Sequence, residues 1–161
     1  MVRTWAPVGE TPILRCKLTH DHYSVISAIT PSGELYLDMQ TKAYDSTAVI
    51  AFLEQLLKQI EGKLLIIWDG ATIHRSKALK SFLAAGATER IWLERLPGYA
   101  PDLNPDEGIW HYLKHVELKN VCCSDLLHLG VELAAAVERL AAKPHVISAC
   151  FAPINKYEKL T

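Results

Sequence analysis

The chain has 161 residues, 50% of them hydrophobic, and a formal net charge of −1 at pH 7, with 17 Lys and Arg against 18 Asp and Glu. This length and composition predict one compact domain with a sizeable core. The balanced charge excludes any overall electrostatic argument for a nucleic-acid partner, and no apolar run approaches the roughly 20 residues that span a bilayer.

The four cysteines form no C-x-x-C pair, and two of them are adjacent; they are Cys16, Cys122, Cys123 and Cys150. An adjacent pair suits a single tetrahedral metal poorly, so we expect reduced and mostly buried thiols. The first residues also lack the apolar core of a signal peptide. We therefore expect a cytoplasmic protein.

The first 40 residues predict an arm followed by three strands. Pro7, Gly9 and Pro12 punctuate the arm, and a strand is expected over residues 13–18. Residues 23–30 are β-branched and apolar, residues 34–40 alternate in polarity, and a Pro-Ser-Gly turn lies between them. This pattern is typical of a β-hairpin.

The hydrophobic period then changes to that of a helix, which Asp45 or Ser46 can begin and Gly62 can close. Residues 64–68 are a continuous apolar run, as in a strand covered on both faces. The remaining expected elements are a helix from Ser76 to Gly86, a strand over 91–93, a helix over 105–115 and a helix over 125–142 that stops at Lys143-Pro144.

This order of elements predicts an α/β fold, a mixed sheet with helices on both faces. Open sheets of this kind carry their chemistry beyond the carboxyl ends of the strands, and Asp69 follows the apolar strand 64–68 directly. One interpretation of Asp69 is a loop residue that accepts hydrogen bonds from the following turn. The other is a functional carboxylate.

Glu107 also has a structural interpretation. Asn104 can be the N-cap of the helix over 105–115, with Pro105 as its first residue, and Glu107 then stands where a capping box places its acid. From the residues alone, both interpretations of Glu107, as a capping residue and as a functional carboxylate, remain open.

Two long motifs and a short arm resemble segments of a known protein family. Residues 68–77 (WDGATIHRSK) resemble the second-Asp segment of the DDE transposases, above all the mariner-type enzymes and their bacterial insertion-sequence relatives. Residues 96–110 (LPGYAPDLNPDEGIW) resemble their third-acid segment, and the separation of 38 positions (107 − 69) suits that group. Residues 3–7 (RTWAP) resemble the arm after the first catalytic strand, so the resemblance covers nearly the whole chain.

The resemblance implies a ribonuclease-H-like fold and metal-assisted phosphodiester chemistry at transposon ends, followed by strand transfer into target DNA. Two Mg²⁺ or Mn²⁺ ions would be held by clustered carboxylates, because two hard cations clamp the attacking and leaving oxygens. Asp69 and Glu107 would each be a catalytic residue and a metal ligand. The implied partners are DNA, and a second copy or a full-length transposase; the implied location is the nucleoid.

The sequence departs from the family pattern in its N-terminal segment. The first catalytic Asp of the family precedes the RTWAP arm, and no residue here matches it. Asp38 and Asp21 are poor substitutes, because one would lie on an edge strand and the other in a turn. We therefore expect residues 1–161 to be a single, truncated catalytic domain that lacks the N-terminal catalytic strand and is inactive alone. The alternative is a non-catalytic DNA-binding or dimerisation fragment.

Several other residues have both a functional and a structural interpretation. His74, Arg75 and Lys77 could contact DNA, as could Lys80, although a hydrogen-bonded loop histidine and a solvated helix face explain them equally well. His111 and His115 have a spacing compatible with zinc but no H-E-x-x-H motif. A phosphatase with Asp69 as nucleophile is poorly supported, because no second Asp follows two positions later.

Overall fold

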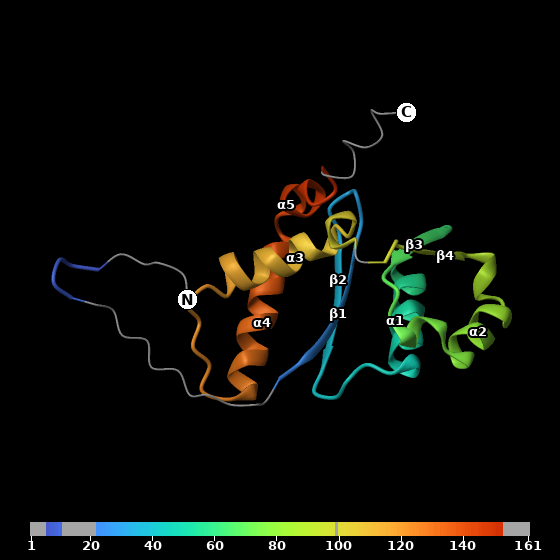
Figure 1. Cartoon of the computed structure of the whole chain (residues 1–161), viewed down its shortest axis with the longest axis horizontal. Coiled ribbons are helices and arrows are strands. Elements are labelled where there is room, and N and C mark those ends of the chain that lie inside the picture. Colours follow the sequence, from blue (N-terminus) through green and yellow to red (C-terminus); the bar gives the residue numbers. More distant parts are fainter. Residues whose placement is uncertain (1–5, 11–21, 99, 153–161) are drawn as a thin grey trace.

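The structure, a computed structural model, describes residues 6–10, 22–98 and 100–152. Its first regular element is the predicted hairpin, formed by β1 (Ser24–Ile29) and β2 (Leu35–Gln40) in antiparallel register (Figure 1). Gly33 in the turn has φ +95, and a Cβ there would lie 2.4 Å from the carbonyl oxygen of Pro144. Only glycine therefore fits this turn. The strand expected over 13–18 lies outside the described residues.

The predicted amphipathic helix is α1 (Ser46–Gln59), and the Asp45 carboxylate caps it by accepting from the Ala48 amide at 2.8 Å. It is followed by β3 (Leu64–Trp68), the short 3₁₀ turn η1 (Thr72–Arg75), α2 (Lys77–Ala84), the 3₁₀ turn η2 (Ala87–Glu89) and β4 (Ile91–Arg95). Strands β3 and β4 pair in parallel, with Trp68 opposite Arg95.

The single mixed sheet that the sequence predicts is not present in the described part of the chain. Two separate two-stranded sheets are found instead, β1–β2 and β3–β4. The expectation that β3 is covered on both faces is also wrong for the described residues, because Leu65 and Ile67 are 63% and 56% exposed. The other face of β3, with Leu64 and Ile66, packs against the cluster around α1. Burial therefore accounts for only part of the apolar run.

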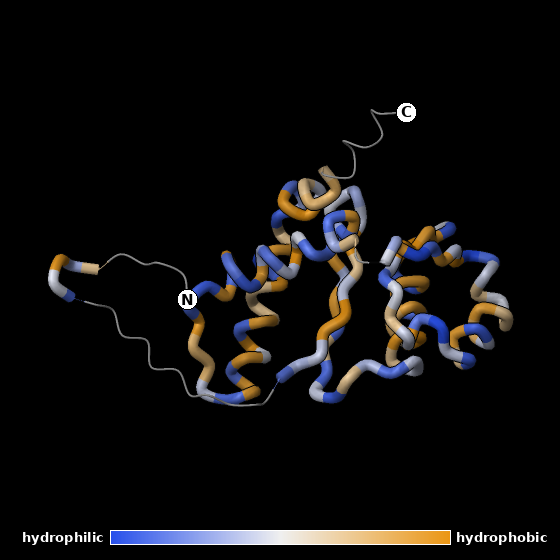
Figure 2. Tube along the Cα trace, in the orientation of Figure 1, coloured by the Kyte–Doolittle hydropathy of each residue, from blue (hydrophilic) through white to orange (hydrophobic). Residues whose placement is uncertain are grey.

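The carboxyl-terminal part consists of helices. The 3₁₀ turn η3 (Pro101–Leu103) leads into α3 (Asp106–Tyr112), which continues as one π-helical stretch, η4 (Leu113–Glu117). Asp125 caps α4 (Leu126–Ala141), and Pro144 begins a further helix, α5 (Pro144–Ala149), which the sequence analysis did not predict. Hydrophobic and hydrophilic positions alternate along α4 (Figure 2). Within the described ranges, no helix is long and apolar enough to cross a membrane.

Two hydrophobic clusters hold the fold together, one on each side of the hairpin (Figure 1). The first joins α1, α2 and β4 and includes Val49, Phe52, Leu53, Leu56, Leu79 and Ile91. The second joins α3, η4, α4 and α5 and includes Ile109, Leu113, Ala136, Leu140 and Ile147. The hairpin contributes to both, because Ile26 packs against the first cluster and Ile29 against the second.

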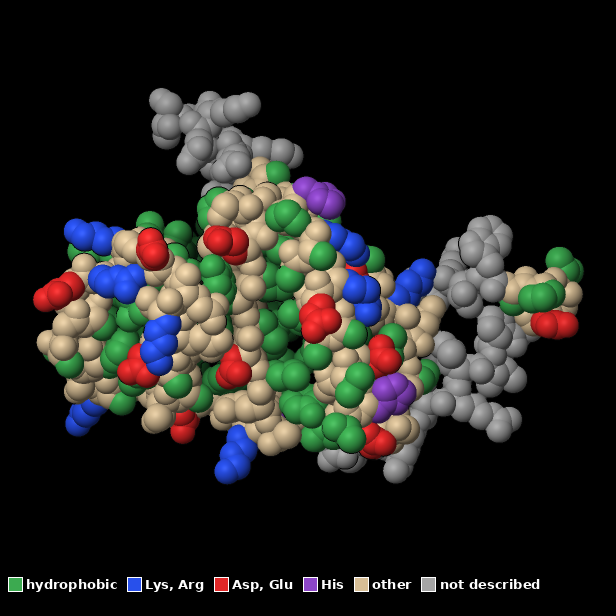
Figure 3. All heavy atoms as spheres, turned by 180° about the vertical axis from the view of Figure 1, so that it is seen from behind, with side chains coloured by type: hydrophobic (Ala, Val, Ile, Leu, Met, Phe, Trp, Pro, Cys, Tyr) green, Lys and Arg blue, Asp and Glu red, His purple; other side chains and the backbone are tan. Residues whose placement is uncertain are grey.

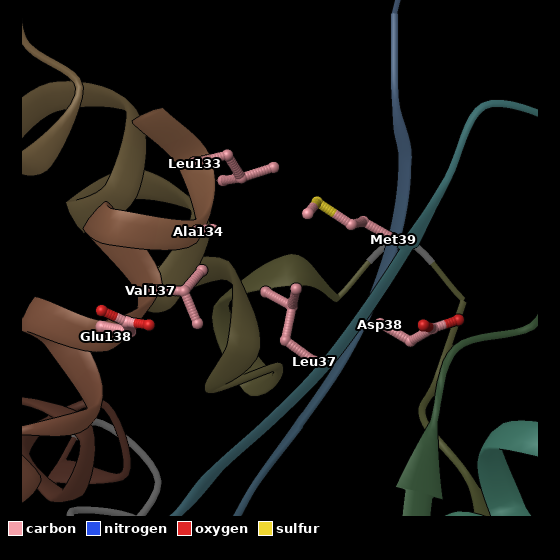
Figure 4. A pocket seen from close by; sticks show the side chains of 7 residues that line it. All are labelled: Leu37, Asp38, Met39, Leu133, Ala134, Val137 and Glu138. Atoms are coloured by element: carbon pink, nitrogen blue, oxygen red, sulfur yellow. The ribbon is translucent and has the colours of Figure 1, made fainter. Parts of the chain in front are cut away.

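A groove of about 440 Å³ remains between β2 and α4. Leu37 and Met39 of β2 point toward Val137 and Leu133 of α4 across it (Figure 4). On the face of the molecule shown in Figure 3, acidic and basic side chains are interspersed, in keeping with the balanced net charge. No broad basic face is visible there.

The prediction that all four cysteines are reduced is wrong, because Cys122 forms a disulfide bond. Cys123 and Cys150 are free thiols. The sequence spacing contained no signal for a disulfide, because the fold can bring cysteines together from positions far apart in the chain.

Candidate active site

Asp69 lies at the carboxyl end of the parallel pair β3–β4, and 66% of its side chain is exposed. Its Oδ1 accepts a hydrogen bond of 2.9 Å from the amide of Ala71 and lies 3.3 Å from Nε2 of His74. The interpretation as a turn acceptor therefore accounts for Oδ1. For Oδ2 no hydrogen-bond donor is found among the described residues, so this oxygen is accessible to a ligand.

His74 lies next to the Asp69 carboxylate, and only 14% of the His74 side chain is exposed. Its ring stacks on Trp68 with 4.2 Å between centroids and 16° between planes. Burial lowers the pKa of His74, and the nearby Asp69 carboxylate opposes this effect only in part. A neutral ring that donates from Nε2 to Asp69 satisfies this geometry, and Nδ1 is left buried with no partner in the described part of the chain. His74 thus orients Asp69.

Glu107 stands exposed in the first turn of α3. The reciprocal bonds of a capping box are not formed, because the Asn104 amide donates to the carbonyl of Pro101 at 2.9 Å. The Asn104 Oδ1 accepts instead from the amide of Asp106 at 3.2 Å. Within the described ranges the Glu107 carboxylate makes no hydrogen bond, so capping does not occupy it.

Asp106, which the sequence analysis did not single out, fixes the turn that carries Glu107. Its Oδ2 accepts hydrogen bonds of 2.6 Å from the Ser27 hydroxyl and 2.9 Å from Nε1 of Trp110. Burial raises the pKa of Asp106, although both hydrogen bonds lower it, and Oδ1 is buried without a partner among the described residues. The spacing of four between Asp106 and Trp110 was the available signal, since it places both on one helix face.

Three cationic side chains lie around Asp69. A cleft of about 280 Å³ is lined by Asp69 together with Arg75, Lys80 and Arg95. Lys77, expected from the sequence to contact DNA, is exposed on α2 and does not line this cleft. Arg95 was missed, because its position opposite Trp68 depends on the pairing of β3 with β4.

The remaining candidates do not join this site. Asp38 on β2 accepts a hydrogen bond of 2.8 Å from the Tyr44 hydroxyl and, after burial, is the main cause of a raised Tyr44 pKa. The rings of His111 and His115 lie 4.5 Å apart. Across the described ranges, no group of three or more His, Cys, Asp or Glu side chains is arranged to hold a metal ion. The carboxylate oxygens of Asp69 and Glu107 have the chemistry that Mg²⁺ and Mn²⁺ prefer, but two carboxylates are a sparse ligand set.

The family to which this fold and these motifs belong is shown by comparison with known proteins. The chain belongs to the DDE superfamily endonuclease family, whose sequence profile matches residues 2–126. No curated protein matches the chain.

Two solved structures resemble the fold. The Mos1 mariner paired-end complex with Mn matches with a TM-score of 0.60 at 16% identity, covering 92% of this chain and 49% of that chain. The Mos1 transposase paired-end complex with the left transposon end matches with a TM-score of 0.58 at 13% identity, covering 92% of this chain and 50% of that chain. The likeness is one of fold, and the chain spans about half of the length of these relatives.

Proposed function

We propose that this chain is the catalytic-domain part of a DDE transposase of the mariner-like and insertion-sequence type, with a ribonuclease-H-like fold and DNA as its substrate. The observation that carries the proposal is the state of two carboxylates. Asp69 Oδ2 and the Glu107 carboxylate have no hydrogen-bond donors among the described residues, and both lie in the region that matches the family. The Mos1 complexes, one with Mn and one with a transposon end, are consistent with a metal and DNA as ligands.

In this proposal Asp69 and Glu107 each contribute oxygen ligands to divalent cations, Mg²⁺ or Mn²⁺, two of them in the complete site. Bound cations would supply an activated water and stabilise charge on the phosphate during hydrolysis and strand transfer. His74 keeps Asp69 in place through the 3.3 Å contact between Nε2 and Oδ1. Asp106 fixes the helix turn that carries Glu107.

A third carboxylate is needed for a two-metal site, and the described residues do not provide one. We propose that it comes from a strand that pairs with β1 and β3. Each of these strands has a single partner in the described part of the chain, and Ile26 of β1 and Ile66 of β3 pack against the same cluster around α1. A strand that pairs with both β1 and β3 would join them into one sheet, and one face of this sheet would pack against the cluster around α1. Without it, cleavage by this chain should be absent or very slow.

Metal binding tests the two carboxylates directly. Titration calorimetry with Mn²⁺ should show binding to the wild-type chain that is sharply weakened in Asp69→Asn and in Glu107→Gln. Asp102→Asn removes another exposed carboxylate, from the turn η3 that precedes α3, and should leave binding unchanged. Equal Mn²⁺ affinity in all four proteins would refute the assignment.

Strand cleavage tests the third carboxylate. The chain alone, with Mg²⁺ and transposon-end DNA, should not nick the DNA. Co-expression with a strand-forming segment that carries an Asp should restore nicking, and Asp69→Ala should abolish it again. Nicking by the chain alone that depends on Asp69 would show that the ligand set is already complete.

The alternative, a non-catalytic fragment that assembles with another chain, is favoured by one observation. Leu65, Ile67 and Trp92 lie on one face of the β3–β4 sheet and are 63%, 56% and 69% exposed. An apolar face of this kind marks a contact surface. Analytical sedimentation of the wild type and of Ile67→Ser tests whether this face is a contact surface. Self-association that is lost in Ile67→Ser, together with the absence of Mn²⁺ binding to the wild type, would support this alternative over the first proposal.

A further inference from the structure

The lining of the cleft beside Asp69 combines apolar and cationic side chains. Leu79, Leu83 and Leu93 form its leucine part, here called the floor, and Arg75, Lys80 and Arg95 are its cations. Leu79 is only 2% exposed and belongs to the hydrophobic core, so the apolar surface that a ligand can contact comes from Leu83 and Leu93, which are partly buried and pack against the same core. Cations together with an apolar floor suit a ligand with one anionic part and one flat, weakly polar part.

The three cations are available for a ligand. Arg75, Lys80 and Arg95 are exposed and make no ion pair with any described residue. Arg90 provides the contrast on the same segment, because its guanidinium donates to the carbonyls of Gly62, Leu57 and Ile60 at 2.6–2.9 Å. Arg90 is therefore used in the fold, whereas Arg95 is not.

Arg95 is also held close to the acidic site. A Cβ at Gly70 would lie 2.5 Å from Nη2 of Arg95, so the absence of a side chain at Gly70 lets the guanidinium lie against the backbone next to Asp69. The same cleft therefore presents a carboxylate and a guanidinium side by side. The carboxylate repels a phosphate on its own, and Arg95 offsets that repulsion at short range.

We propose that this cleft binds one unpaired nucleotide of a DNA strand, with its phosphate on Arg75, Lys80 and Arg95 and its base or sugar on the leucine floor. The proposal rests on DNA being the substrate, as proposed above, and names a subsite next to Asp69. The floor decides between ligands. A free phosphate would leave the exposed parts of Leu83 and Leu93 in water, and a nucleotide within a duplex keeps its base stacked away from the protein. An unpaired nucleotide can cover both the leucines and the cations.

The test is equilibrium binding without metal, which separates this cleft from the metal ligands. Fluorescence anisotropy in EDTA compares the full chain with a short labelled thymidine strand, the same strand in a duplex, and a strand of equal length made of abasic units. Variants Arg95→Ala and Lys80→Ala are compared with Lys77→Ala. Lys77 is also exposed on α2, about one helix turn from Lys80, but it does not line the cleft.

The thymidine strand should bind more tightly than the duplex and roughly fivefold or more tighter than the abasic strand, since base contacts on such floors contribute about 1–3 kcal/mol. Arg95→Ala and Lys80→Ala should each reduce the slope of log K against log salt by about 0.7, while Lys77→Ala leaves it unchanged. Equal binding of the abasic strand, or equal effects of Arg95→Ala and Lys77→Ala, would overturn the proposal. Because Mn²⁺ affinity is measured separately, such a failure would leave the metal site standing, whereas loss of both would overturn the proposed function as well.

Discussion

The carboxylate of Asp106 accepts a hydrogen bond of 2.6 Å from the hydroxyl of Ser27, although 79 positions separate the two residues. This bond connects the first turn of α3 to strand β1, and Trp110 donates to the same oxygen. Glu107 follows Asp106 directly, so its backbone position depends on this connection. Asp106 is therefore a positioning residue for the proposed ligand.

Asp106→Ala should lower the free energy of unfolding by about 1–3 kcal/mol, because the Ser27 hydroxyl and the Trp110 indole lose a buried acceptor. Urea denaturation followed by tryptophan fluorescence measures the change. Asp106→Asn keeps an oxygen acceptor and should be milder. Asp102→Ala, on the exposed turn η3, should stay within about 0.5 kcal/mol of the wild type. If Asp106→Ala were as mild as this control, the hydrogen bonds would be unimportant for stability.

Arg90→Ala should destabilise the chain by about 2 kcal/mol, because three carbonyls at the end of α1 and in the following turn lose a charged donor. Arg90→Lys should recover only part of this, since a single ammonium group cannot reach all three oxygens in the geometry of a guanidinium. Thermal unfolding by circular dichroism measures both variants. Arg95→Ala, at the far end of the strand β4 that follows Arg90, is the matched control and should be close to neutral.

Glu117 should make the stability depend on acid pH. Its hydrogen bonds to Lys143 and Arg139, both at 2.7 Å, lower the pKa of Glu117 below its ordinary value of 4.5. Since the folded pKa is the lower one, the stabilisation is present above about pH 4.5 and is lost as the pH falls through the folded pKa. Glu117→Gln should flatten this part of a stability–pH curve measured by urea denaturation, and an unchanged curve would exclude the ion pairs as its cause.

Local sequence signals predicted much of the secondary structure. The hairpin, the helix that begins after Asp45, the helix capped by Ser76 and the helix that begins after Asp125 are confirmed with small shifts at their ends. The reason is that period, turn residues and caps act over a few positions. Helix α5 was missed because Pro144 was interpreted only as a stop, although proline also suits the first turn of a helix.

Tertiary relationships could not be predicted in the same way. Nothing in the local pattern around Asp106 indicated its bond to Ser27, and the apolar run at β3 gave no sign that one face would be exposed. Both depend on which segments meet in space. The motifs around Asp69 and Glu107 predicted the family because they are long, but the use of Arg95 depends on the pairing of β3 with β4.

The two hydrophobic clusters on either side of the hairpin have a consequence for the cooperativity of the molecule. Asp69 is anchored to the cluster around α1, and Glu107 belongs to the helix that supplies Ile109 to the other cluster. Hydrogen exchange should therefore resolve two units of different stability. A cation bound by both carboxylates would link the two units and favour one relative orientation of them. Cation binding would then stabilise the arrangement in which both units are folded and docked.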